Sequence, residues 1–304
     1  NGTVRYEGSN KLGKSRKARW LPTWNVSAAW NAHEEEFWQS FRDVVSNMTL
    51  KASYSLTADR GPASVSNSKA IINSYNTWRP FTSVKESGLI LSSVENSELT
   101  YEKKHELNIG AEIGFIDNRI NIEADWYTRN NFDLIGLIYT KGTGGQLAKF
   151  ANVASMKSSG VEFTVSTRNI KTKDFSWNTD FIFSHTKNEV TDLQSNASVM
   201  DMISGNGFAM EGYPIRALFS MDFQGLNENG YPTFINEKGQ LTVSDINFQE
   251  QLKKDHLVYE GPTDPTMTGS LGNIFRYKGF TLNAFITYSF GNVIRLDPVF
   301  HNVY

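Results

Sequence analysis

Residues 107–126 read LNIGAEIGFIDNRINIEADW, and their alternation carries most of the information about the fold. In the first half, apolar residues from Leu107 to Phe115 occupy every second position, with polar residues or glycine between them. After Asp117–Arg119 the alternation resumes from Ile120 to Trp126. A period of two is typical of a strand with one apolar and one polar face. The stretch therefore predicts an antiparallel hairpin with a tight turn.

The same period recurs along the chain and predicts about nine strands in an all-β fold. In the predicted strand Phe280–Phe290, Phe285 is the one bulky residue on the polar side. The further predicted strands lie near Thr3–Tyr6 and at Trp24–Trp30, Met48–Leu56, Val161–Val165, Phe175–Phe183, Leu271–Tyr277 and Phe280–Phe290.

The connections between these strands alternate in length. Short turns are expected at Asp117–Arg119, Lys171–Lys173 and Lys278-Gly279, and long polar stretches at about 58–98, 131–158 and 189–266. A β-sandwich has no reason to alternate in this way, whereas an outer-membrane barrel has short periplasmic turns and long extracellular loops. The pattern favours a transmembrane antiparallel β-barrel. Because a bacterial single-chain barrel has an even number of strands, the missing strands are expected outside this segment.

Composition excludes several other classes of protein. The 304 residues have a net charge of -2, so no basic surplus favours nucleic acid, and the absence of cysteine excludes disulfides and thiolate chemistry. No apolar run approaches the ~20 residues of a membrane helix, but a barrel strand needs only ~9–11. Charged residues fall on the polar faces of the predicted strands, which predicts a wide, hydrated interior. They are Lys51, Glu112, Glu123, Asp125, Glu162 and Asp180.

Motifs for catalysis are missing from the sequence. It has no glycine-rich phosphate loop, His-Glu-x-x-His motif or nucleophile elbow, and its five histidines are isolated. We therefore expect neither an enzyme nor a cofactor or metal site. Asn227–Gly230 lacks the acidic spacing of a calcium loop and predicts a turn. His33–Ser46 has helical periodicity and predicts a short interfacial helix, and aromatic residues near strand ends predict interfacial girdles.

Several stretches, in order along nearly the whole chain, resemble the SusC/RagA family of TonB-dependent outer-membrane transporters of Bacteroidetes. Ala52, Tyr101 and Ser159 depart mildly from the residues that are usual in this family. The matching stretches are Val4–Gly13, Trp20–Asn31, Leu50–Ser55, Tyr101–Gly110, Asp125–Tyr127, Asn152–Ala154, Ser159–Glu162 and Glu211–Pro214.

This resemblance implies a Gram-negative outer-membrane barrel of 22 strands, filled by an N-terminal plug. It also implies energy from TonB, acting through the plug outside this segment, and a SusD-like surface lipoprotein as a lid. Dimers of transporter–lid pairs, contact with outer-membrane lipid and a cargo of oligosaccharide or oligopeptide follow from the same resemblance. The segment, 1–304, then corresponds to the C-terminal part of the barrel, without its last strands.

Two other functions remain open at this stage: a passive porin or adhesin-like barrel without a plug, and a secreted sugar-binding β-sandwich. For the transporter, aromatic and basic residues of the long loops are the candidates for substrate binding, because aromatic rings offer broad faces for stacking. The same residues could instead pack the loops. The candidates are Tyr75, Trp78, Arg79, Tyr213, Tyr231 and Phe234.

Overall fold

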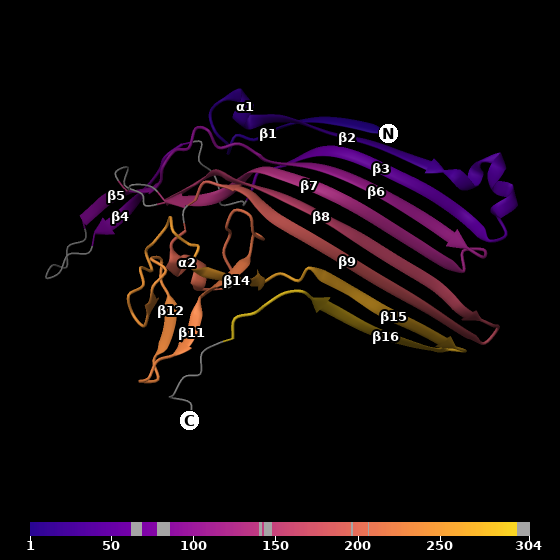
Figure 1. The fold of residues 1–304 in the computed structure, drawn as a ribbon. Helices are drawn as coiled ribbons and strands as arrows, with labels where there is room; N and C mark the ends of the chain where they lie inside the picture. Colours follow the sequence, from indigo (N-terminus) through magenta and orange to yellow (C-terminus); the bar gives the residue numbers. More distant parts are fainter. Residues whose placement is uncertain are drawn as a thin grey trace.

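Nine long strands form one antiparallel sheet in a computed structural model that describes residues 1–61, 69–77, 86–139, 142, 148–195, 197–205 and 207–296. Their spatial order is β1-β2-β3-β6-β7-β8-β9-β15-β16, so that consecutive long strands are neighbours (Figure 1). They are β1 (Gly2–Gly8), β2 (Trp20–Asn31), β3 (Val45–Asp59), β6 (Glu102–Phe115), β7 (Ile120–Tyr139), β8 (Ala148–Lys171), β9 (Phe175–Leu193), β15 (Met267–Tyr277) and β16 (Phe280–Phe290).

All nine predicted strands are present, and most are longer than the alternation alone indicated. The single sheet contradicts the β-sandwich alternative, because a sandwich divides its strands between two packed sheets. Within the described residues the sheet is open, with β1 and β16 at its edges. Each edge leaves a row of backbone N–H and C=O groups without a strand partner, which closure into a barrel would satisfy.

Short connections lie at one end of the sheet, which we call the turn end (right side of Figure 1). The turn between β6 and β7 places Ile116, Asp117 and Asn118 in the left-handed region, and Lys278 adopts it between β15 and β16. The helix predicted at His33–Ser46 is present as 3₁₀-helix over part of that stretch. The structure has two 3₁₀-helices, η1 (Ala32–Glu34) and η2 (Glu36–Phe41), separated by the extended residue Glu35.

Long connections lie at the opposite end, the loop end (left side of Figure 1). There the stretch predicted as a loop at 131–158 is mostly strand, because β7 and β8 stay paired as far as Tyr139 and Ala148. A bulge between Asn131 and Leu134 shifts the alternation of apolar and polar residues. The period of two is therefore interrupted there, and the sequence pattern did not predict the rest of the strand. The other two long stretches contain elements of their own: β4 (Ile71–Thr77), β5 (Glu86–Ser93), α2 (Val199–Ile203), β10 (Ala217–Met221), β11 (Phe223–Leu226), β12 (Pro232–Ile235), β13 (Leu241–Thr242) and β14 (Leu257–Pro262).

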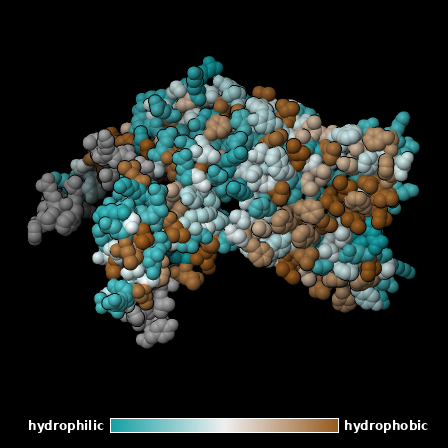
Figure 2. All heavy atoms as spheres, viewed as in Figure 1, coloured by the Kyte–Doolittle hydropathy of each residue, from teal (hydrophilic) through white to brown (hydrophobic). Residues whose placement is uncertain are grey.

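One face of the sheet is apolar and exposed. Residues paired across strands share a face, so the register places Val26 beside Tyr54, Ile109 beside Trp126, and Leu271 beside Ile286. Many large apolar side chains of this face are exposed, from Leu271 at 36% to Phe280 at 81%. Figure 2 shows hydrophobic atoms gathered over the half of the strands nearer the turn end. An exposed apolar face of this extent indicates an apolar surrounding medium.

Buried residues of the described chain gather at the loop end instead. One core joins Leu12, Leu99 and Tyr101, and a second joins Ala197, Met202, Ala217 and Phe219. Among the described residues, no helix has the length and apolarity needed to cross a membrane. The nine-stranded sheet thus forms a wall with one apolar and one polar face, which we call the two-faced wall. The two packed cores lie in its loops.

Candidate functional site

The polar face of the sheet carries a cluster of opposed charges. Glu112 and Glu123 are directly paired across β6 and β7, and Asp125 is paired with Glu162 across β7 and β8. On the adjacent β3, the Lys51 Nζ contacts Glu112 and lies 3.9 Å from the Glu123 Oε1. Four carboxylates for one ammonium group leave this region negative, which requires water on this face.

A second polar group lies further toward the loop end. The Glu106 Oε1 accepts a hydrogen bond from the Arg129 Nη2 at 3.2 Å, and the Glu106 Oε2 forms an ion pair with the Lys104 Nζ at 2.7 Å. The Arg129 guanidinium lies 3.9 Å above the Tyr127 ring, and the Tyr127 hydroxyl is 2.8 Å from the Thr186 Oγ1. The two clusters make a continuous hydrophilic wall. Among the described residues, no group of three or more acidic, histidine or cysteine side chains is arranged to hold a metal ion.

Aromatic rings on the apolar face mark both of its borders. Toward the loop end, His105 stacks between Tyr54 at 5.7 Å and Phe132 at 5.6 Å, and Trp24 lies 5.3 Å from Tyr54. Toward the turn end, Trp177 stacks on Phe275 at 5.6 Å. Aromatic rings at both borders of an apolar band are typical of the interfacial girdles of membrane barrels, and the girdle assignment stays a prediction.

Hydrogen bonds at the loop end join two connections, 9–19 and 94–101, to each other and to strand β8. The Gly13 N–H donates to the Leu99 carbonyl at 2.8 Å, and the Asn96 Nδ2 donates to the Phe150 carbonyl at 3.0 Å. Tyr101 is buried in the first core, and burial raises the pKa of its phenol above the ordinary value of 10.0, with Glu7 adding to the shift. These hydrogen bonds and the first core give the loop end a packed structure of its own.

The connection between β9 and β15 folds on its own small core. Tyr213 packs on Phe219 at 5.2 Å and on Tyr259 at 4.9 Å, and burial raises the pKa of Tyr259. Two hydrogen bonds fix this core to the sheet, because Val190 donates to the Tyr213 carbonyl and Gly212 donates back to Val190, both at 2.8 Å.

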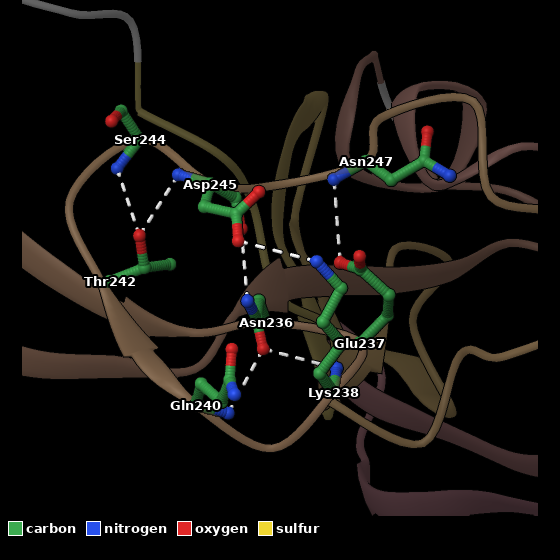
Figure 3. A network of polar contacts seen from close by, with 8 residues as sticks. All are labelled: Asn236, Glu237, Lys238, Gln240, Thr242, Ser244, Asp245 and Asn247. Atoms are coloured by element: carbon green, nitrogen blue, oxygen red, sulfur yellow. Dashed lines mark hydrogen bonds and ion pairs between the residues drawn. The ribbon is translucent and has the colours of Figure 1, made fainter.

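Two asparagines shape the tip of this connection in the same way. The Asn236 Oδ1 accepts from the backbone of Lys238 at 3.0 Å and of Gln240 at 2.9 Å, and its Nδ2 donates to the Asp245 carbonyl at 3.0 Å (Figure 3). The Asn227 Oδ1 likewise accepts from the backbone of Asn229 and Tyr231, at 3.0 and 2.9 Å. Asn227–Gly230 is therefore a turn, as the sequence predicted, and side-chain hydrogen bonds from both asparagines define the backbone of the tip.

The structure separates the candidate binding residues. Tyr75 is exposed on β4, in the two-stranded β4–β5 hairpin, whereas Trp78 and Arg79 lie outside the described residues. Tyr213 belongs to the small core, where its ring packs the connection. Phe234 packs on Phe223 at 5.9 Å in the β11–β13 sheet.

Of the six candidates, Tyr75 and Tyr231 are the two that the structure describes as exposed. The sequence did not single out further exposed apolar residues of the β11–β12–β13 sheet, because short irregular strands carry no clear period. They are Phe223, Leu226 and Leu241.

Comparison with known proteins identifies a family and several relatives. The family described as TonB dependent receptor-like, beta-barrel matches residues 1–297. TonB-dependent receptor P3 of Formosa agariphila is 25% identical over 96% of this chain and 30% of its own length. TonB-dependent receptor SusC of Bacteroides thetaiotaomicron is 25% identical over 97% of this chain and 30% of its own length.

Solved structures share the fold of the chain. The RagAB peptide transporter superposes with a TM-score of 0.77 at 22% identity, over 95% of this chain and 31% of the matched chain. The same transporter in its open-open state gives a TM-score of 0.75 at 21% identity, over 96% of this chain and 30% of the matched one. The nine strands therefore superpose on part of a larger barrel.

Proposed function

Since the chain belongs to the TonB dependent receptor-like β-barrel family, we propose that it is part of the wall of an importer that takes up a nutrient actively with energy from TonB. The sheet is part of a transmembrane antiparallel barrel of the outer membrane. The chain spans about a third of the length of the curated relatives, with 30% of each covered. The family is one of receptors and transporters rather than of enzymes.

The observation that carries the proposal is the two-faced wall. Its apolar face suits lipid, and its polar face brings Lys51, Glu106, Glu112, Glu123 and Arg129 into ion pairs. Such a wall is stable in a bilayer only when the polar face meets water or other polar groups, as it does around a wide lumen. A wide lumen suits a large hydrophilic cargo.

The cargo that we propose is an oligosaccharide or an oligopeptide, and the partner is a SusD-like surface lipoprotein that covers the loop end. RagAB is described as a peptide transporter, which supports the oligopeptide class. The oligosaccharide class and the lipoprotein partner follow from the resemblance of this chain to the SusC/RagA family. The exposed rings of Tyr75 and Tyr231 are candidate contacts for cargo or lid, together with Trp78 and Arg79. TonB would act through a plug outside this segment, and pairs of transporter and lid would form dimers.

Uptake by the intact protein tests this proposal. A strain that lacks the gene is compared with one that expresses the full-length protein, on single glycans and on peptide mixtures, with and without a functional TonB. We expect growth on one cargo class to require both the protein and TonB. Uptake that persists without TonB would contradict active import and favour the passive porin.

A further inference from the structure

The connection between β2 and β3, where the sequence predicted a short interfacial helix, carries exposed aromatic residues at the turn end. Phe37 and Phe41 are each 57% exposed, and Val44 is 63% exposed. Trp30, the last outward residue of β2, lies 6.4 Å from Phe37, which is 6.2 Å from Trp38. We call Trp30, Phe37, Trp38, Phe41 and Val44 the aromatic ledge.

Local contacts hold the ledge in one conformation. The Trp38 Nε1 donates to the Val45 carbonyl at 2.9 Å, and the Trp30 Nε1 donates to the Glu35 Oε1 at 3.0 Å. Val44 in turn donates to Phe41 and accepts from Ile116, both at 3.0 Å. Both indole donors are satisfied within the protein, so the ledge presents mainly apolar surface.

The ledge is continuous with the lipid-facing side of the wall. Trp30 and Leu50 are paired across β2 and β3 and share the apolar face. In a 3₁₀-helix, residues three apart lie on one side, so Trp38 and Phe41 form an apolar row while Glu36 and Gln39 form a polar one. This arrangement is amphipathic, with its apolar side joined to the membrane surface of the barrel.

We propose that the aromatic ledge inserts into the inner leaflet of the outer membrane and anchors the turn end at the phospholipid headgroups. Short turns of such barrels face the periplasm, so the adjacent leaflet is the phospholipid one. Aromatic rings and neighbouring carboxylates are compatible at this depth, about 5–10 Å into the headgroup and acyl boundary. The inference rests on the outer-membrane location and is independent of import.

Depth measurement with single fluorescent labels tests the ledge. Phe41→Cys and Gln39→Cys are introduced separately into full-length protein freed of other cysteines, labelled, and placed in nanodiscs of phosphatidylethanolamine and phosphatidylglycerol. Lipids with a nitroxide near the headgroup report contact with the bilayer, and iodide reports contact with water. Gln39 is the matched control, because it lies on the polar row of the same helix.

We expect the Phe41 label to be quenched about threefold more strongly by the nitroxide lipid than the Gln39 label, with the order reversed for iodide. Equal access of iodide to both labels would overturn the proposal. A Phe41 label shielded from both quenchers would also overturn it, because protein would then cover the ledge. If Phe41→Cys changes the thermal transition of the protein, Val44→Cys carries the label instead.

Discussion

The side-chain amide of Asn152 pairs with both backbone polar groups of Thr100: its Oδ1 accepts from the Thr100 N–H at 2.9 Å, and its Nδ2 donates to the Thr100 carbonyl at 3.0 Å. The same Nδ2 also donates to the Asp133 carbonyl at 2.6 Å. The Asn152 side chain thus takes the place of a neighbouring strand, because it pairs with the backbone of Thr100 just before β6 begins.

Asn152→Ala should destabilise the loop end, because it leaves three half-buried backbone groups without partners. We expect a loss of about 3 kcal/mol in the free energy of unfolding, since an unsatisfied group costs about 1–3 kcal/mol and the half-buried position of these three groups keeps each cost near the low end. Thermal unfolding of the detergent-solubilised full-length protein measures it. Asn130→Ala, at an exposed strand position, is the control, and an equal effect of both substitutions would contradict this role of Asn152.

Gly160→Ala should displace Tyr127 from the polar wall. A Cβ at position 160 would lie 2.5 Å from the Tyr127 hydroxyl and 2.5 Å from the His185 carbonyl. Because the backbone atom cannot move aside cheaply, we expect a loss of about 1–3 kcal/mol. Gly279→Ala, whose Cβ would meet nothing within 4 Å, is the control. Denaturant titration compares the unfolding midpoints of the two variants. Equal midpoints would show that the sheet around position 160 accommodates the added Cβ.

Tyr101 should make the protein sensitive to alkaline pH. Burial raises its pKa in the folded protein above the unfolded value of 10.0, so its contribution is full below pH 10. Stability is then lost as the pH rises from 10 through the folded pKa. Melting temperatures measured across this interval should fall less in Tyr101→Phe than in the wild type, while Tyr231→Phe, at an exposed position, should follow the wild type. Identical curves for all three proteins would exclude Tyr101 as the source.

Tyr231→Ala should weaken uptake without weakening the barrel. If the exposed ring stacks on cargo or lid, its loss removes about 0.5–1.5 kcal/mol, or about 2–10-fold in affinity. The readout is the concentration of cargo at half-maximal uptake, with melting temperature as the check on folding. Tyr277→Ala, at an exposed position of the turn end, is the control. An unchanged half-maximal concentration would remove Tyr231 from the candidate residues.

Alternation was sufficient to predict every long strand, because a sheet with one face in lipid and one in water must alternate. It failed where the backbone departs from the regular ladder. Asp133 adopts a φ of 58° within the bulge that ends the first period of β7. The His33–Ser46 pattern is compatible with a 3₁₀-helix as well as an α-helix, and only the observed hydrogen bonds distinguish the two.

In the stretches that resemble the family, the structure explains why particular residues stand at particular positions, which the sequence alone did not reveal. A Cβ on Gly13 would lie 2.1 Å from the Ser97 carbonyl, and Gly212 needs a φ of 84°. Asn152 holds a connection 52 residues away in the chain. Such constraints join distant segments and leave no local period. Tyr213 packs in its small core, which is the alternative that the sequence left open for all six candidates. Tyr75 and Tyr231 are exposed, and their role in binding stays a prediction.

The central claim is that this chain is part of a membrane barrel whose polar face lines an import path. Native mass spectrometry of the full-length protein, extracted from the source outer membrane with mild detergent, tests it most directly. We predict a barrel subunit much heavier than this segment, together with a lipoprotein in a near-equal amount. Recovery of the protein in the soluble fraction would contradict the membrane barrel, and a small barrel alone would contradict the importer with its lid.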